Sequence, residues 1–264
     1  MVNEPKKSAF SIVELLVVIV IIASLTGLAI PAINMIQKSY NSTGSENMIS
    51  AALSTARTIA MNKQRYAGIR FQKAYNPEFP NDPLKQDQYM IFIVNGGFRP
   101  MHNIWTGYHV VEAMKPIKLP ENIGVMDMTD ISGDGDVETT EQLINATAFS
   151  IVFSSSGKLV ICEVRVRNKD GETEGTESLT KSKDQVFNTF TKITHNTDSY
   201  GMFIQDDYQD DGLWQELSRN SLLIYDRKKL QSIDYRRRYS EYLKNLEKNE
   251  SIYINAYTGA IIDK

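Results

Sequence analysis

The stretch KKSAFSIVELLVVIVIIASLTGLAIPAI, residues 6–33, places one carboxylate at the head of a long apolar run. No charged residue occurs from position 15 to position 37. A helix that rises about 1.5 Å per residue would let this run cross a hydrocarbon core of about 30 Å. The lysines before it predict that residues 1–9 stay in the cytoplasm. A cleaved secretion signal or a plain membrane anchor would explain the length, but neither explains Glu14.

The same stretch resembles the type III signal of type IV pilins and type II secretion pseudopilins. These families have a short basic leader, a small residue, then Phe, and a Glu as the fifth residue of the mature chain. On this sequence the leader is 1–9, the cut lies between Ala9 and Phe10, and Glu14 is that fifth residue. Pro31 lies where many pilins have a Pro that kinks the helix. The residue before the cut is usually Gly in these families, and here it is Ala9.

The resemblance implies processing by prepilin peptidase, which removes the leader and methylates the new amino terminus of Phe10. An isolated carboxylate in an apolar bundle is costly, and the terminal ammonium of a neighbouring subunit reduces that cost. We therefore interpret Glu14 as an assembly residue that sets the stagger between subunits. The alternative is a Glu that only reaches back to the membrane surface. The further implied partners are other pseudopilins or pilins, an inner-membrane assembly platform and the lipid bilayer.

The predicted fold class is α+β, a pilin-like fold in which a long N-terminal transmembrane and amphipathic helix packs on an antiparallel β-sheet. An apolar stripe at Met48, Ala52, Thr55 and Ile59 predicts that the helix continues beyond the membrane. The expected segments are a leader (1–9), a transmembrane helix half (10–37), a periplasmic amphipathic half (38–65) and a periplasmic β-rich domain (66–264) with a mobile loop (167–184).

Runs rich in β-branched and aromatic residues predict the strands of that sheet. They are YAGIRF (66–71), YMIFIV (89–94), WTGYHVVE (105–112), IGVMDM (123–128), AFSIVF (148–153), KLVICEVRV (158–166) and SLLIYD (221–226). SSSG at 154–157 predicts a tight turn between two of them, and SIYINAYTGAIID (251–263) predicts a closing hairpin. Residues 234–249 have the pattern of a helix.

Composition restricts the classes of function. The chain of 264 residues is 42% hydrophobic and 23% charged, as in an ordinary globular protein, and its net charge of −3 predicts no nucleic-acid partner. The one Cys, Cys162, excludes an internal disulfide. Its His residues (His102, His109, His195) have no zinc-type spacing, and no nucleophile elbow, phosphate loop or dinucleotide fingerprint occurs. We therefore predict no catalytic residue and no enzyme activity.

The acidic stretch DISGDGDVETTE, residues 130–141, matches most of the register of a Ca²⁺-binding loop. Hard oxygen ligands around one Ca²⁺ would come from Asp130, Ser132, Asp134, Asp136, Glu138 and Glu141. The alternative is a solvated acidic turn, and no cofactor is required for the predicted function. A second acidic group has no such spacing, so we expect it at the surface: Asp206, Asp207, Asp210 and Asp211.

A second and less specific likeness covers residues 53–72 and 117–160, which resemble H-type minor pseudopilins and fimbrial minor pilins. Together the two resemblances imply a structural minor subunit of a type II secretion pseudopilus, acting in protein secretion across the outer membrane. The alternatives are a minor type IV pilus subunit, for pilus assembly, adhesion or DNA uptake, and a monomeric membrane-tethered binding module. The expected location is the bacterial inner membrane as a single-pass protein with a periplasmic C-terminal domain, and then a periplasmic filament.

Overall fold

A computed structural model describes residues 12–96, 98–99, 104–105, 107–127, 129, 140–168, 186–195, 202–206 and 216–262. Within these ranges the side chains of 12–14, 21–43, 98–105, 140–141 and 195 are not described. The chain divides into two compact units, Met1–Gly44 and Ser45–Lys264. Helix α1 (Ile12–Lys63) contributes its first part to one unit and its second part to the other.

The predicted fold class is corrected at α1. In the part of the chain that the structure describes, no helix has the length and apolar character needed to cross a membrane. The fold class with a transmembrane helix is therefore wrong, and the structure supports a mixture of helices and sheets.

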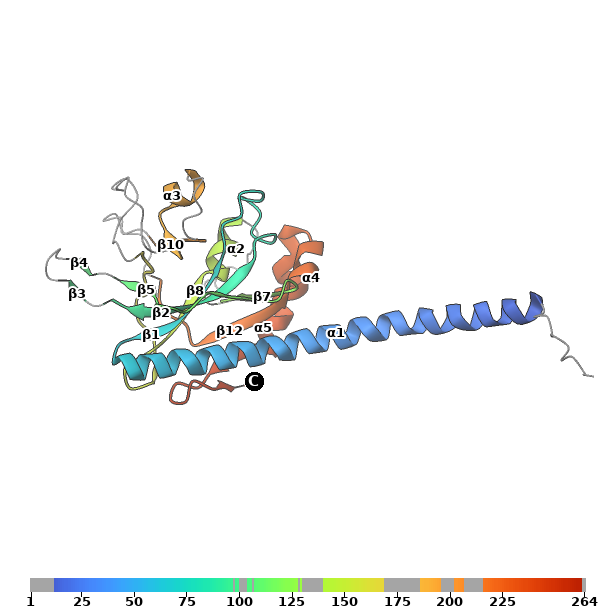
Figure 1. The fold of residues 1–264 in the computed structure, drawn as a ribbon, viewed down its shortest axis with the longest axis horizontal. Helices are drawn as coiled ribbons and strands as arrows, with labels where there is room; N and C mark the ends of the chain where they lie inside the picture. Colours follow the sequence, from blue (N-terminus) through green and yellow to red (C-terminus); the bar gives the residue numbers. More distant parts are fainter. Residues whose placement is uncertain are drawn as a thin grey trace, which may run out of the picture. The chain divides into compact units, whose positions relative to one another are not determined.

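The larger sheet has the strand order β5-β2-β1-β8-β9, with β6 paired to β2 (Figure 1). All of its pairings are antiparallel, and β1 is the central strand, where Arg70 lies between Ile91 and Ser150. The strands are β1 (Ala67–Lys73), β2 (Gln88–Asn95), β5 (Tyr108–Val110), β6 (Ile117–Lys118), β8 (Phe149–Phe153) and β9 (Leu159–Val160).

The smaller sheet has the order β14-β13-β12-β7 and is also antiparallel. Its strands are β7 (Ile123–Met126), β12 (Ser221–Asp226), β13 (Ser251–Ile254) and β14 (Ile261–Ile262). Short helices pack with it around Leu223 and Tyr225, which are fully buried. They are α2 (Thr140–Thr147), α4 (Arg227–Ser232), a π-helical turn (Tyr239–Leu243) and α5 (Lys244–Glu250). A 3₁₀ turn (Tyr235–Arg237) with no buried residue lies between α4 and the π-helical turn in the sequence.

Two further strand pairs and one short helix complete the described elements. Strands β3 (Phe98–Arg99) and β4 (Ile104–Trp105) form an antiparallel pair. Strands β10 (Phe187–Asn188) and β11 (Phe203–Ile204) form a parallel pair, and α3 (Phe190–His195) follows β10.

The second part of α1 packs against both sheets. Its core positions are Ile49, Ala52, Leu53, Ala56 and Ala60, of which all but Ala52 are completely buried. The small alanine side chains let the helix axis approach the strands closely. The same core contains Ile69, Phe71, Phe149, Ile151 and Phe153 from the larger sheet and Leu222, Ile252 and Ile254 from the smaller one.

The opposite face of the larger sheet is covered by described residues that lie between β9 and β12 in the sequence. Ile91 and Ile93 of β2 and Val152 of β8 are completely buried there, together with Val164, Val166, Phe187 and Phe203. Because side chains alternate along a strand, this is also the face of Arg70 and Gln72. The central strand therefore presents apolar residues to α1 and polar residues to the covering segments.

Gln88 connects the two sheets. Its Nε2 donates to the backbone oxygens of Val125 (2.7 Å) and Thr147 (2.8 Å), and its Oε1 accepts from the Val125 backbone N–H (2.8 Å). The side-chain amide thus takes the role of a backbone peptide at the edge of β7, where an unpaired N–H would be costly. Gln88 is buried, so these bonds lie inside the protein.

Candidate functional site

The first candidate site is an apolar segment of α1, residues 15–20. Each of its six side chains is exposed, from 43% for Val18 to 59% for Leu16. More than one full turn of the helix is therefore apolar on every side and uncovered. A helix that is apolar all round is normally buried in a protein or a membrane. The apolar segment is thus a surface that needs a covering partner.

The predicted processing and assembly residues lie beside this segment. Glu14 and Pro31 belong to α1, which continues on both sides of Pro31, but their side chains lie outside the described set. Ala9 and Phe10 lie outside the described residues altogether. The cleavage site, the register role of Glu14 and the kink at Pro31 therefore stay predictions.

The predicted calcium loop also lies outside the described residues. This applies to Asp130, Ser132, Asp134, Asp136 and Glu138, while Glu141 contributes only its backbone, in α2. Among the residues whose side chains are described, no group of three or more His, Cys, Asp or Glu is placed to hold a metal ion. The calcium loop stays a prediction.

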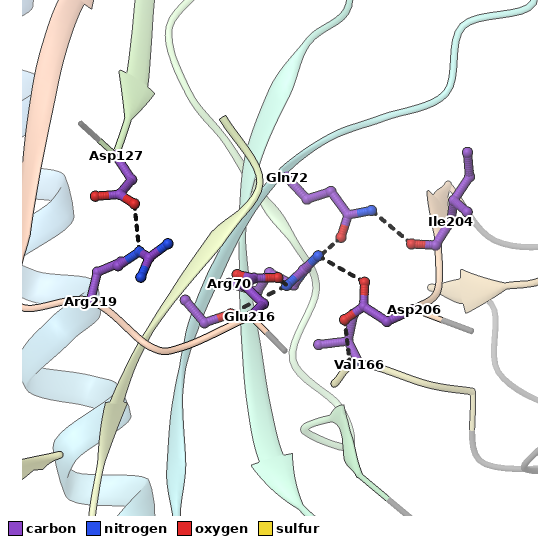
Figure 2. A network of polar contacts seen from close by, with 9 residues as sticks. Arg70, Gln72, Asp127, Val166, Ile204, Asp206, Glu216 and Arg219 are labelled. Carbon is purple, nitrogen blue, oxygen red and sulfur yellow. Dashed lines mark hydrogen bonds and ion pairs between the residues drawn. The ribbon is translucent and has the colours of Figure 1, made fainter. Parts of the chain in front are cut away.

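The second candidate site is an ionic cluster formed by Arg70, Asp127, Asp206, Glu216 and Arg219. Figure 2 shows the Arg70 guanidinium at its centre, on the face of β1 that points away from α1. Arg70 Nη1 lies 2.7 Å from Glu216 Oε2, and Arg70 Nη2 lies 3.1 Å from Asp206 Oδ1. The Arg70 side chain is only 3% exposed, whereas its partners Asp206 (29%) and Glu216 (23%) are partly exposed, so the two ion pairs are partly buried.

Polar neighbours fix the Arg70 guanidinium and its partners. Arg70 Nε donates to Gln72 Oε1 (2.7 Å), and Gln72 Nε2 donates to the Ile204 backbone oxygen (2.7 Å). Asp206 Oδ2 accepts from the Val166 backbone N–H at 2.8 Å. The Arg70 side chain on the central strand thereby holds two segments that are distant in sequence, at Asp206 and Glu216.

The other ion pair of the cluster joins the two sheets. Arg219 Nε lies 2.5 Å from Asp127 Oδ2, directly after strand β7. Asp127 Oδ1 also accepts from the backbone N–H and the hydroxyl of Thr129. The Arg219 backbone N–H donates to Ser150 of β8 at 2.7 Å. Arg219 therefore links the residue that follows β7 to strand β8 of the larger sheet.

Burial and the neighbouring charges shift the pKa values of Arg70 and Glu216. Burial disfavours the charge on Arg70, but the charges of Asp206 and Glu216 outweigh burial and raise its pKa. Burial raises the pKa of Glu216 to about 7, although the charge of Arg70 acts in the opposite direction. Glu216 can therefore gain or lose a proton near neutral pH, which is a chemical property of this site.

Sequence reasoning did not find the ionic cluster. The expectation that Asp206 lies at the surface holds only in part: its side chain is 29% exposed, but its carboxylate pairs with a buried guanidinium, which the sequence did not predict. Asp207, Asp210 and Asp211 lie outside the described residues. The available signal was Arg70 itself, a charge in the middle of the apolar run YAGIRF, because a charge on a central strand needs a partner.

Comparison with known proteins assigns no family. No protein-family model, no curated protein and no solved structure matches this chain.

Proposed function

We propose that this chain is a structural minor subunit of a type II secretion pseudopilus. In this proposal prepilin peptidase cuts between Ala9 and Phe10, and the chain then joins other pseudopilins through the first part of α1. An inner-membrane platform would assemble the subunits into a periplasmic filament. The observation that carries the proposal is the exposed apolar segment, residues 15–20, directly after Glu14.

The physical argument concerns the cost of leaving the apolar segment in water. Burial of a Val, Leu or Ile side chain contributes about 1.5–3 kcal/mol, and all six residues of the segment are exposed. Because the apolar residues surround the helix, one flat partner surface would cover only part of them. A bundle of equivalent helices from several subunits would cover every side, as in a filament core.

The position of Glu14 supports a bundle with a defined stagger. A carboxylate one residue before the apolar segment would be buried by the same packing. It would then require a positive partner, and the amino terminus of Phe10 in a neighbouring subunit would supply one. Contact between the two is possible only at a fixed offset between helices, which is how Glu14 would set the register.

Cysteine crosslinking of the full-length protein in its native cells tests the proposal. The variant Leu16→Cys, in a Cys162→Ser background, places a single thiol in the apolar segment. We expect ladders of covalently linked subunits after oxidation. The matched control Lys244→Cys, exposed on α5, should give monomers. Addition of Glu14→Ala should weaken the ladder, and an unchanged ladder would contradict the register role.

The mass of the same protein separates this proposal from its rivals. A chain that begins at methylated Phe10 and forms the ladder supports a filament subunit. A chain that begins at Phe10 but stays monomeric favours a tethered binding module. A chain that begins at Met1, or in the thirties after a secretion-signal cut, would contradict processing by prepilin peptidase.

A further inference from the structure

The ionic cluster has more carboxylates than cations. Arg70 and Arg219 supply two positive charges, and Asp127, Asp206 and Glu216 supply three negative ones. With every group ionised the formal charge is −1. An excess charge is unfavourable where water reaches it only in part, as at Glu216 (23% exposed) and Asp206 (29% exposed), and binding of one proton removes it.

The cluster also holds two segments of the chain onto the larger sheet. Asp206 follows strand β11, and its backbone N–H donates to the Val166 oxygen at 2.8 Å. Glu216 lies five residues before the start of β12, and its backbone oxygen accepts from the Val164 N–H at 2.9 Å. Both segments meet the central strand through the same Arg70 guanidinium. The charge state of the cluster therefore acts on the attachment of residues 202–206 and 216–219.

We propose that the ionic cluster is a one-proton switch: proton uptake by Glu216 tightens the attachment of residues 202–206 and 216–219 to the sheet, and proton release loosens it. The inference does not rest on the proposed function. It concerns the covering layer of the larger sheet, whatever the chain assembles with.

The partners of each carboxylate identify Glu216 as the group that takes the proton. Asp127 accepts from Thr129 and pairs with Arg219, and Asp206 accepts from the Val166 N–H and pairs with Arg70. Glu216 shares Arg70 with Asp206, and its Oε1 is buried with no hydrogen-bond partner among the described residues. An ionised Glu216 thus has the weakest compensation.

The surrounding charges set the direction of the switch. Glu216 is influenced by Arg70 and Arg219, which favour its ionised form, and by Asp206, which disfavours it. Burial is the largest influence and raises its pKa from 4.5 to about 7. The attached state therefore holds a proton that the detached state releases between these values. Attachment weakens as the pH rises from about 4.5 to about 7 and changes little above.

Hydrogen exchange on the full-length protein in nonionic detergent tests the switch. Protection factors, corrected for intrinsic exchange, would be measured at pH 5, 6, 7 and 8 for the backbone amides of Val164, Val166, Asp206 and Arg219. In the unmodified protein we expect protection to fall roughly 30-fold between pH 5 and pH 7. Glu216→Gln should remove this fall. The matched control Glu163→Gln, an exposed Glu in a neighbouring segment, should keep it.

Two results would overturn the inference. One is protection that stays level or rises between pH 5 and pH 7 in the unmodified protein. The other is a fall that persists in Glu216→Gln. If Glu216→Gln does not fold, Asp206→Asn serves instead: loss of a neighbouring negative charge favours ionised Glu216 and should move the fall to lower pH. An unmoved midpoint in Asp206→Asn would equally contradict the switch.

Discussion

The two faces of the larger sheet are covered in different ways. Toward α1, strand β1 presents Ile69 and Phe71, which pack with the helix and with β8. Away from α1, the same strand presents Arg70 and Gln72, which bind two covering segments through ion pairs and hydrogen bonds. Adjacent residues of one strand thus take part in an apolar core on one side and an ionic cluster on the other.

This difference separates two kinds of stability. The apolar face owes its stability to buried area and close packing, which respond little to pH. The ionic face owes its stability to groups whose charge depends on the solution, and one of them titrates near neutral pH. We expect variants of apolar residues on the first face to change stability by a constant amount and variants of the ionic cluster on the second face to change how stability depends on pH.

The largest effect is expected from Phe71→Ala. The Phe71 ring is completely buried and stacks on Phe149, with ring centroids 4.9 Å apart. Its loss leaves a cavity between α1 and the sheet and should lower the free energy of unfolding by about 3–5 kcal/mol. Urea denaturation at pH 5 and pH 8 measures it. The control Phe79→Ala, partly exposed in a loop, should cost far less. A cost for Phe71→Ala that differed strongly between the two pH values would break the comparison.

Arg70→Met should cost nearly as much, but in a pH-dependent manner. The substitution keeps the apolar part of the side chain and leaves Asp206 and Glu216 without their cation. Removing one partner of a buried ion pair costs about 3 kcal/mol when the other stays charged. At pH 5, protonation of Glu216 should relieve part of this cost. The free energy of unfolding should therefore fall more at pH 8 than at pH 5. Arg65→Met, on an exposed Arg, is the control. Equal losses at both pH values would contradict the ionic account.

Local sequence predicted many of the strands. YAGIRF, YMIFIV and AFSIVF lie in β1, β2 and β8, since runs of β-branched and aromatic residues fit a covered sheet. The prediction of a strand over KLVICEVRV was only partly right, because β9 ends at Val160. The residues after Val160 bind to residues 216–218 through single contacts. The run 234–249 forms successive short helical turns, with Tyr242 and Leu246 buried but Tyr235 exposed. Tertiary packing, which local patterns do not contain, decided these outcomes.

The ionic cluster was beyond the reach of local patterns for a different reason. Arg70 bonds to Asp206 and Glu216 across sequence separations of 136 and 146 residues. Nothing near either acid indicates which cation it will meet, and a run of Asp is typical of a solvated surface. The apolar segment, in contrast, can be recognised in the sequence, because its composition alone predicts that the segment needs a covering partner.

A smaller effect on the free energy of unfolding is expected from Gln88→Leu. Gln88 is a polar residue on the apolar face. Gln88 pairs with Lys73 across β1 and β2 and bonds to backbone groups instead of charges. The substitution keeps the volume but leaves the Val125 N–H and two backbone oxygens unsatisfied, which should cost about 2 kcal/mol at any pH. Urea denaturation measures this, with Gln231→Leu, at an exposed position of α4, as the control. If Gln88→Leu lowers the free energy of unfolding no more than Gln231→Leu does, then water or a local shift replaces the hydrogen bonds of the amide.

The smallest effect tests whether charge, and not the choice of face, decides the pH dependence. Lys73 lies at the buried end of the apolar face and donates to the Pro83 oxygen. Burial, and then the charge of Arg227, lowers its pKa from 10.5 to about 7. Above pH 7 the unfolded chain therefore binds a proton that the folded chain does not, and stability should rise by about 1 kcal/mol between pH 7 and pH 8. Lys73→Met should abolish this rise, while Lys244→Met, on an exposed Lys, should keep it.

The trend expected for Lys73 has the opposite sign to that expected for Glu216, and it lies on the other side of pH 7. If Lys73→Met leaves the rise unchanged, the pH dependence comes from elsewhere. If it abolishes the rise, a titratable group buried on the apolar face makes stability depend on pH, as Glu216 does on the ionic face.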